Sequence, residues 1–64
     1  MNNRILRLPI VIELTGLSRS TIYLHIKNGV FPKPISLGRR AVGWLESDIQ
    51  QWLDQRIEES REAE

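Results

Sequence analysis

The chain has 64 residues, 41% of them hydrophobic, and this length allows one small domain. It has no cysteine and one histidine, which excludes disulfides and a thiolate or multi-histidine metal site. No apolar run approaches the roughly 20 residues of a membrane span, and the N-terminus lacks a signal peptide's apolar core, so we expect a cytoplasmic, nucleoid-associated protein without membrane contact. The net charge of +1 conceals an asymmetry: residues 1–44 carry seven basic and one acidic side chains (+6), whereas residues 45–64 carry two basic and seven acidic (−5). The first part is therefore suited to a polyanionic partner.

The first elements along the chain are a short strand at residues 4–7 and a helix at about residues 9–15. Pro9 suits a first helical position, and Gly16 is a C-terminal stop signal. Helical spacing predicts that the buried face of this helix consists of Ile10, Val11 and Leu14.

A second helix is predicted at about residues 18–28. Ser18 is a good N-cap, and Asn28-Gly29 is a good stop. Ile22 and Ile26 lie four residues apart and should point inward together with Val30. An adjacent polar and cationic face consists of Arg19, Tyr23 and Lys27. Leu24 lies on the side away from the isoleucines, where it could touch a thymine methyl group, contact another protomer, or simply be exposed.

An extended connection and a β-hairpin follow. The prolines of "FPKPI" prevent a helix and present Lys33 between them. Lys33 could meet a phosphate there, or it could be a surface lysine that only increases solubility. Two apolar runs then flank Gly38-Arg39-Arg40, which predicts a hairpin at about residues 35–44. Phe31 should pack under this hairpin.

The last predicted element is an amphipathic helix at about residues 47–60. Ser47 and Gln50 form a capping-box pattern. The apolar stripe that follows consists of Ile49, Trp52, Leu53 and Ile57. Trp44 and Trp52 are assigned to the core. From about residue 58 to residue 64 the chain is acidic and nearly free of apolar residues, so this tail should fray.

Two helices joined by a glycine turn match the helix-turn-helix arrangement, whose second helix lies in the DNA major groove. The residues at its leading end can bond bases or phosphates, and they are Ser18, Arg19, Ser20, Thr21 and Tyr23. The competing interpretation is a generic amphipathic surface helix, in which Arg19 is solvated and Ser18 only caps. Arg39 and Arg40 at a hairpin tip favour the first interpretation, because backbone phosphates or a narrow minor groove would relieve their repulsion. Lys27 and Lys33 complete the candidate DNA-binding set.

Four stretches carry a family resemblance: "LTGLSRSTIY", "FPKPI", "LGRRAVGW" and "DIQQWL", in this order and nearly ungapped. With them the chain resembles the AlpA family of prophage regulators over residues 6–53. The resemblance implies a mainly α, winged helix-turn-helix domain spanning residues 1–64, similar to MerR-type and excisionase DNA-binding domains. It also implies a transcriptional regulator of a phage or mobile element, often one that promotes excision functions. The recognition helix then maps onto "SRSTIY" and the wing tip onto Arg39 and Arg40. The chain departs from the family at Leu24-His25, where a basic and then an apolar residue are common.

We therefore expect a sequence-specific regulator that binds double-stranded DNA. Selective binding should need two protomers on adjacent half-sites or a second protein such as integrase or RNA polymerase. Two other hypotheses are an architectural excisionase that bends an attachment site and a protein-interaction adaptor that uses the acidic helix. An enzyme is not expected, because no glycine-rich phosphate loop or base–nucleophile pair is visible. Neither a cofactor, a metal nor a small-molecule ligand is expected, since the longer effector modules of MerR regulators are absent.

Overall fold

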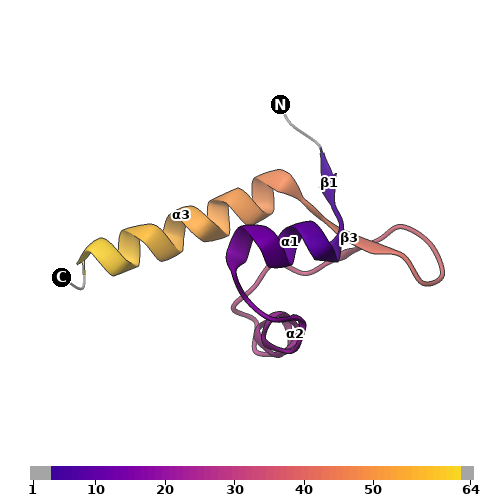
Figure 1. The fold of residues 1–64 in the computed structure, drawn as a ribbon, viewed down its shortest axis with the longest axis horizontal. Coiled ribbons are helices and arrows are strands. Elements are labelled where there is room, and N and C mark those ends of the chain that lie inside the picture. The colour runs from indigo at the N-terminus through magenta and orange to yellow at the C-terminus, as the bar shows by residue number, and fades with distance from the viewer. Residues whose placement is uncertain (1–3, 63–64) are drawn as a thin grey trace.

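A computed structural model describes residues 4–62, which form three helices around a small antiparallel sheet (Figure 1). The elements in chain order are β1 (Ile5–Leu6), α1 (Leu8–Thr15), α2 (Arg19–Lys27), β2 (Ile35–Ser36), β3 (Val42–Leu45) and α3 (Glu46–Glu62). The prediction of a mainly helical fold with a small hairpin is confirmed. No helix of this described part combines the length and apolar composition that a membrane span requires.

Strand β3 is the centre of the sheet, and it joins the start of the chain to the hairpin. The strand order is β1-β3-β2, with Leu6 opposite Trp44 and Ile35 opposite Gly43. Gly43 is buried where β1 and β2 both approach. A Cβ atom at this position would lie 2.5 Å from Ile5 Cγ2 and 3.1 Å from the Leu6 carbonyl oxygen. A larger residue at this position would therefore require the Ile5 side chain to move and the Leu6 carbonyl to shift slightly.

The core takes one or two side chains from almost every element. Its buried members are at most 5% exposed, and they are Leu6, Val11, Ile22, Phe31, Trp44 and Ile49. Trp44 was predicted to lie in the core, and this is confirmed; Phe31, predicted to pack under the hairpin, is buried in the same core. Half-buried side chains complete the core, including those of Trp52 and Leu53.

The predicted buried face of α1 is wrong at two of its three positions. Val11 is buried, but Ile10 and Leu14 are exposed. The face that meets the core consists of Leu8, Val11, Ile12 and Thr15, which follow the spacing i, i+3, i+4, i+7. Both apolar faces have helical spacing, and β1 determines which of them is buried. Strand β1 pairs with β3 and buries Leu6, and the chain enters α1 directly from this strand.

Two predictions about neighbouring segments are also corrected. Val30 is exposed rather than inward, because the chain leaves α2 at Asn28 and passes Gly29, which has a φ of 74°.

The capping box of α3 is not formed: the Gln50 amide donates to Asp54 at 2.9 Å. Instead, β3 runs straight into α3, and the Glu46 N–H donates to the Arg4 carbonyl at 2.8 Å.

Helix α3 leaves the core after its second turn and projects to one side of the molecule (Figure 1). Ile49 is buried and Leu53 is half-buried, whereas Ile57 is exposed. The helix continues to Glu62, past the position near 58 where fraying was predicted. Residues with high helix propensity and an Arg56–Glu59 ion pair of 2.8 Å account for the extension. Residues 63 and 64 of the predicted tail lie outside the described residues.

Candidate nucleic-acid interface

The turn between α1 and α2 is built from local backbone signals. Gly16 ends α1 in the left-handed region with a φ of 71°, and its N–H donates to the Ile12 carbonyl at 2.8 Å. The Leu17 N–H donates to the Thr15 hydroxyl at 3.3 Å. Buried Ile22 then anchors α2 on the core, which leaves the opposite side of α2 exposed. The two helices are therefore joined by a short turn at Gly16, as the sequence predicted.

At the leading end of α2, two hydroxyl groups bond to each other. The Thr21 N–H donates to Ser18 Oγ at 3.2 Å, and the Ser18 and Thr21 hydroxyl oxygens lie 2.9 Å apart. Ser18 thus has the predicted N-cap role. A base contact from either hydroxyl stays a prediction, because both are engaged in the cap.

The side chains of Arg19, Ser20, Tyr23 and Lys27 are exposed on α2. The Arg19 guanidinium lies over the Tyr23 ring, 5.9 Å from its centroid. Such a contact restrains both side chains without consuming the hydrogen-bond donors of the arginine. Lys27 follows one turn after Tyr23. The cationic face predicted on this helix is therefore present and open to a partner.

The tip of the β2–β3 hairpin carries the arginine pair. The Leu37 N–H donates to the Ala41 carbonyl at 2.7 Å, which closes the loop around Gly38, Arg39 and Arg40. Both arginines are exposed, and Figure 1 shows this loop extending away from the body of the molecule, at the end opposite the C-terminal end of α3. The structure therefore presents the two charges at a projecting point, as a partner-binding tip requires.

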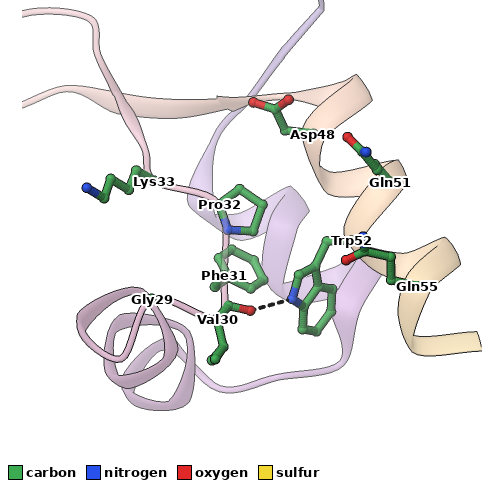
Figure 2. Close-up of a pocket in the computed structure, with 9 residues that line it drawn as sticks. All are labelled: Gly29, Val30, Phe31, Pro32, Lys33, Asp48, Gln51, Trp52 and Gln55. Carbon is green, nitrogen blue, oxygen red and sulfur yellow. Dashed lines mark hydrogen bonds between the residues drawn. The ribbon is translucent and has the colours of Figure 1, made fainter. Parts of the chain in front are cut away.

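Two indole groups hold the connection between α2 and the hairpin. The Trp52 indole N–H donates to the Val30 carbonyl at 2.7 Å, and the Trp44 indole N–H donates to the Pro32 carbonyl at 3.0 Å. Between these anchors, buried Phe31 packs edge-on against Trp52 with 4.9 Å between ring centroids (Figure 2). Sequence reasoning assigned both tryptophans to the core and missed these bonds. They fix the position of α2 relative to the hairpin.

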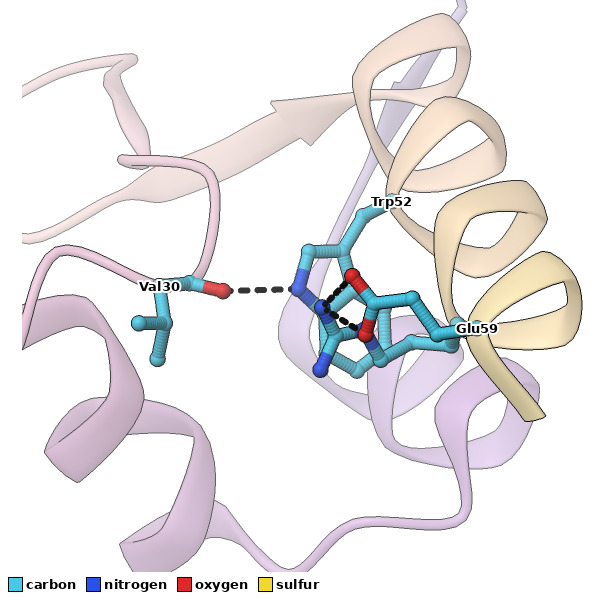
Figure 3. A network of polar contacts seen from close by, with 4 residues as sticks. Val30, Trp52 and Glu59 are labelled. Carbon is cyan, nitrogen blue, oxygen red and sulfur yellow. Dashed lines mark hydrogen bonds and ion pairs between the residues drawn. The ribbon is translucent and has the colours of Figure 1, made fainter. Parts of the chain in front are cut away.

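The outer side of Trp52 is covered by an arginine. The Arg56 guanidinium lies 5.6 Å from the Trp52 ring centroid and also pairs with Glu59 (Figure 3). Beside this network lies an open groove of about 590 Å³, lined by Gly29, Val30, Phe31, Pro32, Lys33, Asp48, Gln51, Trp52 and Gln55. Figure 2 shows the Lys33 side chain extending from the connection away from α3, and this side chain is exposed.

The positive charge of this region is not neutralised within the described residues. No acidic residue occurs between Glu13 and Glu46, whereas this stretch holds five basic side chains: Arg19, Lys27, Lys33, Arg39 and Arg40. All five are exposed. The ion pairs of residues 4–62 are Arg4–Glu46 and Arg56–Glu59, and neither involves a member of this set. We call these five residues the basic surface; it spans α2, the connection and the hairpin.

The chain is similar to one protein family and to two known proteins. The family described as "Prophage CP4-57 regulatory protein (AlpA)" matches residues 4–57. The chain is 52% identical over 54 residues to the uncharacterized protein ORF88 of Enterobacteria phage P4, a match that covers 84% of this chain and 61% of that protein. It is 50% identical over 66 aligned positions to the DNA-binding transcriptional activator AlpA of Escherichia coli strain K12, covering 88% of this chain and 94% of the activator. The match thus spans less than two thirds of the phage protein.

Proposed function

The chain belongs to the AlpA family of prophage regulatory proteins, as its sequence motifs predicted, and we propose from this membership that it binds double-stranded DNA and regulates transcription for a prophage or mobile element. The observation that carries the proposal is the basic surface, which is exposed, forms no ion pair within residues 4–62 and spans α2, the connection after it and the hairpin. The relative from Escherichia coli, named as a DNA-binding transcriptional activator, supports the same function.

In this proposal α2 is the recognition helix and enters the major groove. Arg19, at its first turn, is suited to bidentate hydrogen bonds with guanine O6 and N7. Ser20 is small and exposed, so the helix can approach the base edges closely. The contact of Arg19 with Tyr23 restrains the guanidinium before binding and so lowers the entropic cost of the base contact.

The hairpin acts as the wing. Arg39 and Arg40 would bind backbone phosphates or enter a narrow minor groove beside the site read by α2. Lys27 and Lys33 lie between these two contacts in sequence and would bind phosphates. Because the Trp44 and Trp52 indole bonds fix the connection, the two contacts would meet DNA in one fixed spacing.

A domain of this size would bury about 600–1,000 Å² of protein surface on DNA. We therefore propose that selective binding uses two protomers on adjacent half-sites, or a second protein such as integrase or RNA polymerase. The proposal places the chain in the cytoplasm, associated with the nucleoid, and gives it no enzymatic activity and no cofactor.

The test is binding of the full chain to a library of intergenic DNA fragments from its own genetic element, at two salt concentrations with competitor DNA. A selected fragment and a steep loss of affinity with salt are expected. Arg19→Ala should then reduce the free-energy discrimination between bases by about 1–3 kcal/mol at one base pair. Arg61→Ala, which removes an exposed arginine from α3, is the matched control and should leave it intact.

Three outcomes separate this function from its rivals. Salt-sensitive binding without any selected fragment would favour an architectural, excisionase-type role over promoter recognition. Selection that is unchanged at every base pair in Arg19→Ala would contradict the assignment of Arg19 as a base-reading residue of α2. Absence of binding even at low salt would overturn the DNA-binding proposal and favour a protein-interaction adaptor.

A further inference from the structure

Leu24 is a large apolar side chain on the outward side of α2. It is 54% exposed, whereas Ile22, two residues earlier, is fully buried. Two residues advance about 200° around a helix, so Leu24 and Ile22 lie on nearly opposite sides. Leu24 therefore contributes little to the core, and its apolar surface faces whatever α2 meets.

The surroundings of Leu24 on α2 are polar. Its neighbours three and four residues away are Ser20 and Thr21 on one side and Lys27 and Asn28 on the other. Thr21 is half-buried, and the other three are exposed. Leu24 is thus a single apolar point within a polar and cationic face. A protein partner would require a larger apolar patch, because interface binding energy comes from a cluster of well-packed and desolvated residues.

The DNA major groove offers a partner of the matching size. Among the groups that the four bases present there, the C5-methyl of thymine is an isolated apolar group surrounded by hydrogen-bond donors and acceptors. Leu24 is suited to bury such a methyl group while Ser20 and Lys27 remain beside polar base edges and phosphates. We propose that Leu24 is a specificity-determining residue that reads one thymine methyl; this inference rests on the proposed function.

The proposal gives α2 a division of roles. Arg19, five residues earlier, reads a guanine through hydrogen bonds, and Leu24 reads a thymine through apolar contact. Leu24 therefore discriminates against cytosine and also against uracil, which has the hydrogen-bonding groups of thymine and lacks only the methyl group. This difference of one methyl group makes the contact directly testable.

The probe is a duplex that the wild-type chain selects from a randomised DNA pool. Each thymine of the selected duplex is replaced in turn by deoxyuridine, and affinities are measured for the wild-type chain, Leu24→Ala and Leu14→Ala. Leu14 is the matched control because it is 50% exposed but lies on α1. Circular dichroism checks that the variants remain folded, as the exposure of both side chains predicts.

One uracil substitution should weaken wild-type binding about fourfold, the factor that burial of one methyl group supplies. The same substitution should have no effect on Leu24→Ala, while Leu14→Ala should keep the full wild-type sensitivity. Sensitivity that persists in Leu24→Ala, or a wild-type chain insensitive at every thymine, would overturn the inference and leave DNA binding standing. DNA binding without any selected sequence would also overturn it. That outcome would also favour the architectural role over transcriptional regulation, and a complete absence of DNA binding would overturn the proposed function altogether.

Discussion

Replacing Arg39 or Arg40 with alanine should reduce the salt dependence of DNA binding and leave the fold unchanged. Both side chains are exposed at the tip of the hairpin, outside the bond between Leu37 and Ala41 that closes the loop. Neither forms an ion pair within residues 4–62. Their removal therefore takes nothing from the folded state, and the effect on binding reports their contacts with DNA.

The size of the effect follows from the number of cations in the basic surface. Each phosphate contact contributes about 0.9 to the slope of log K against log salt. If the four basic side chains other than Arg19, which is assigned to a base, meet one phosphate each, the slope is about −3.6, and affinity falls about 150-fold between 50 and 200 mM salt. Loss of one arginine of the hairpin tip should bring the slope to about −2.7, and loss of both to about −1.8.

The slopes are measured by fluorescence anisotropy of a labelled duplex across a salt series. Arg61→Ala serves as the control, since Arg61 is an exposed arginine on α3, outside the basic surface. Its slope should equal that of the wild-type chain. An unchanged slope in both Arg39→Ala and Arg40→Ala would refute the wing assignment. A reduced slope in Arg61→Ala would show that α3 also contacts DNA.

Three further substitutions test the scaffold by urea denaturation followed with circular dichroism. Gly43→Ala should lower the free energy of unfolding by about 1–3 kcal/mol, because the new methyl group overlaps β1; a neutral effect would mean that β1 moves aside freely. Ser18→Ala should cost about 1 kcal/mol through loss of the bond from the Thr21 N–H, and wild-type stability would contradict the capping role. Trp52→Phe should lower the free energy of unfolding by about 1 kcal/mol or more, since the Val30 carbonyl loses its donor. Unaltered stability together with unaltered DNA affinity would show that this bond does not position α2.

The bounds of the first two helices could be predicted closely because their signals are local. Gly16 ends α1 through a left-handed backbone that other residues adopt at a cost, and Ser18 caps α2 through its own side chain. The hairpin was predictable for the same reason, since its short loop lies between two apolar runs. Signals of this kind need no knowledge of the tertiary structure.

The features that sequence reasoning missed depend on distant segments. The buried face of α1 could not be chosen between two helical stripes, since the choice depends on β1 pairing with a strand almost 40 residues later. The indole bonds join residues 12 and 22 positions apart, so no local pattern reveals them. The capping box failed because a backbone carbonyl from Arg4, at the other end of the chain, meets the start of α3.

The exposed positions of the candidate residues could be predicted from the sequence, because each residue belongs to a local pattern. Arg19 and Tyr23 have the spacing of neighbours on a helix, and the structure brings them into contact. Arg39 and Arg40 lie at the tip that the loop sequence indicated. Sequence could not show that these groups belong to one rigid surface, because that property comes from the bonds of Trp44 and Trp52 to the connection between them.

The net charge of +1 predicts weak attraction to a polyanion, yet the distribution of charge matters more than its sum. Helix α3 has 17 residues and so extends about 25 Å, with Glu58, Glu59 and Glu62 on the part that projects from the body. The C-terminal end of α3 and the hairpin tip lie at opposite ends of the long axis (Figure 1). At physiological salt, exposed charges more than about 8 Å apart are largely screened from one another. The far carboxylates therefore leave the attraction of the hairpin tip for phosphate almost undiminished, and they repel any DNA that approaches along α3. This separation would orient the encounter so that α2 and the hairpin, rather than α3, face the duplex.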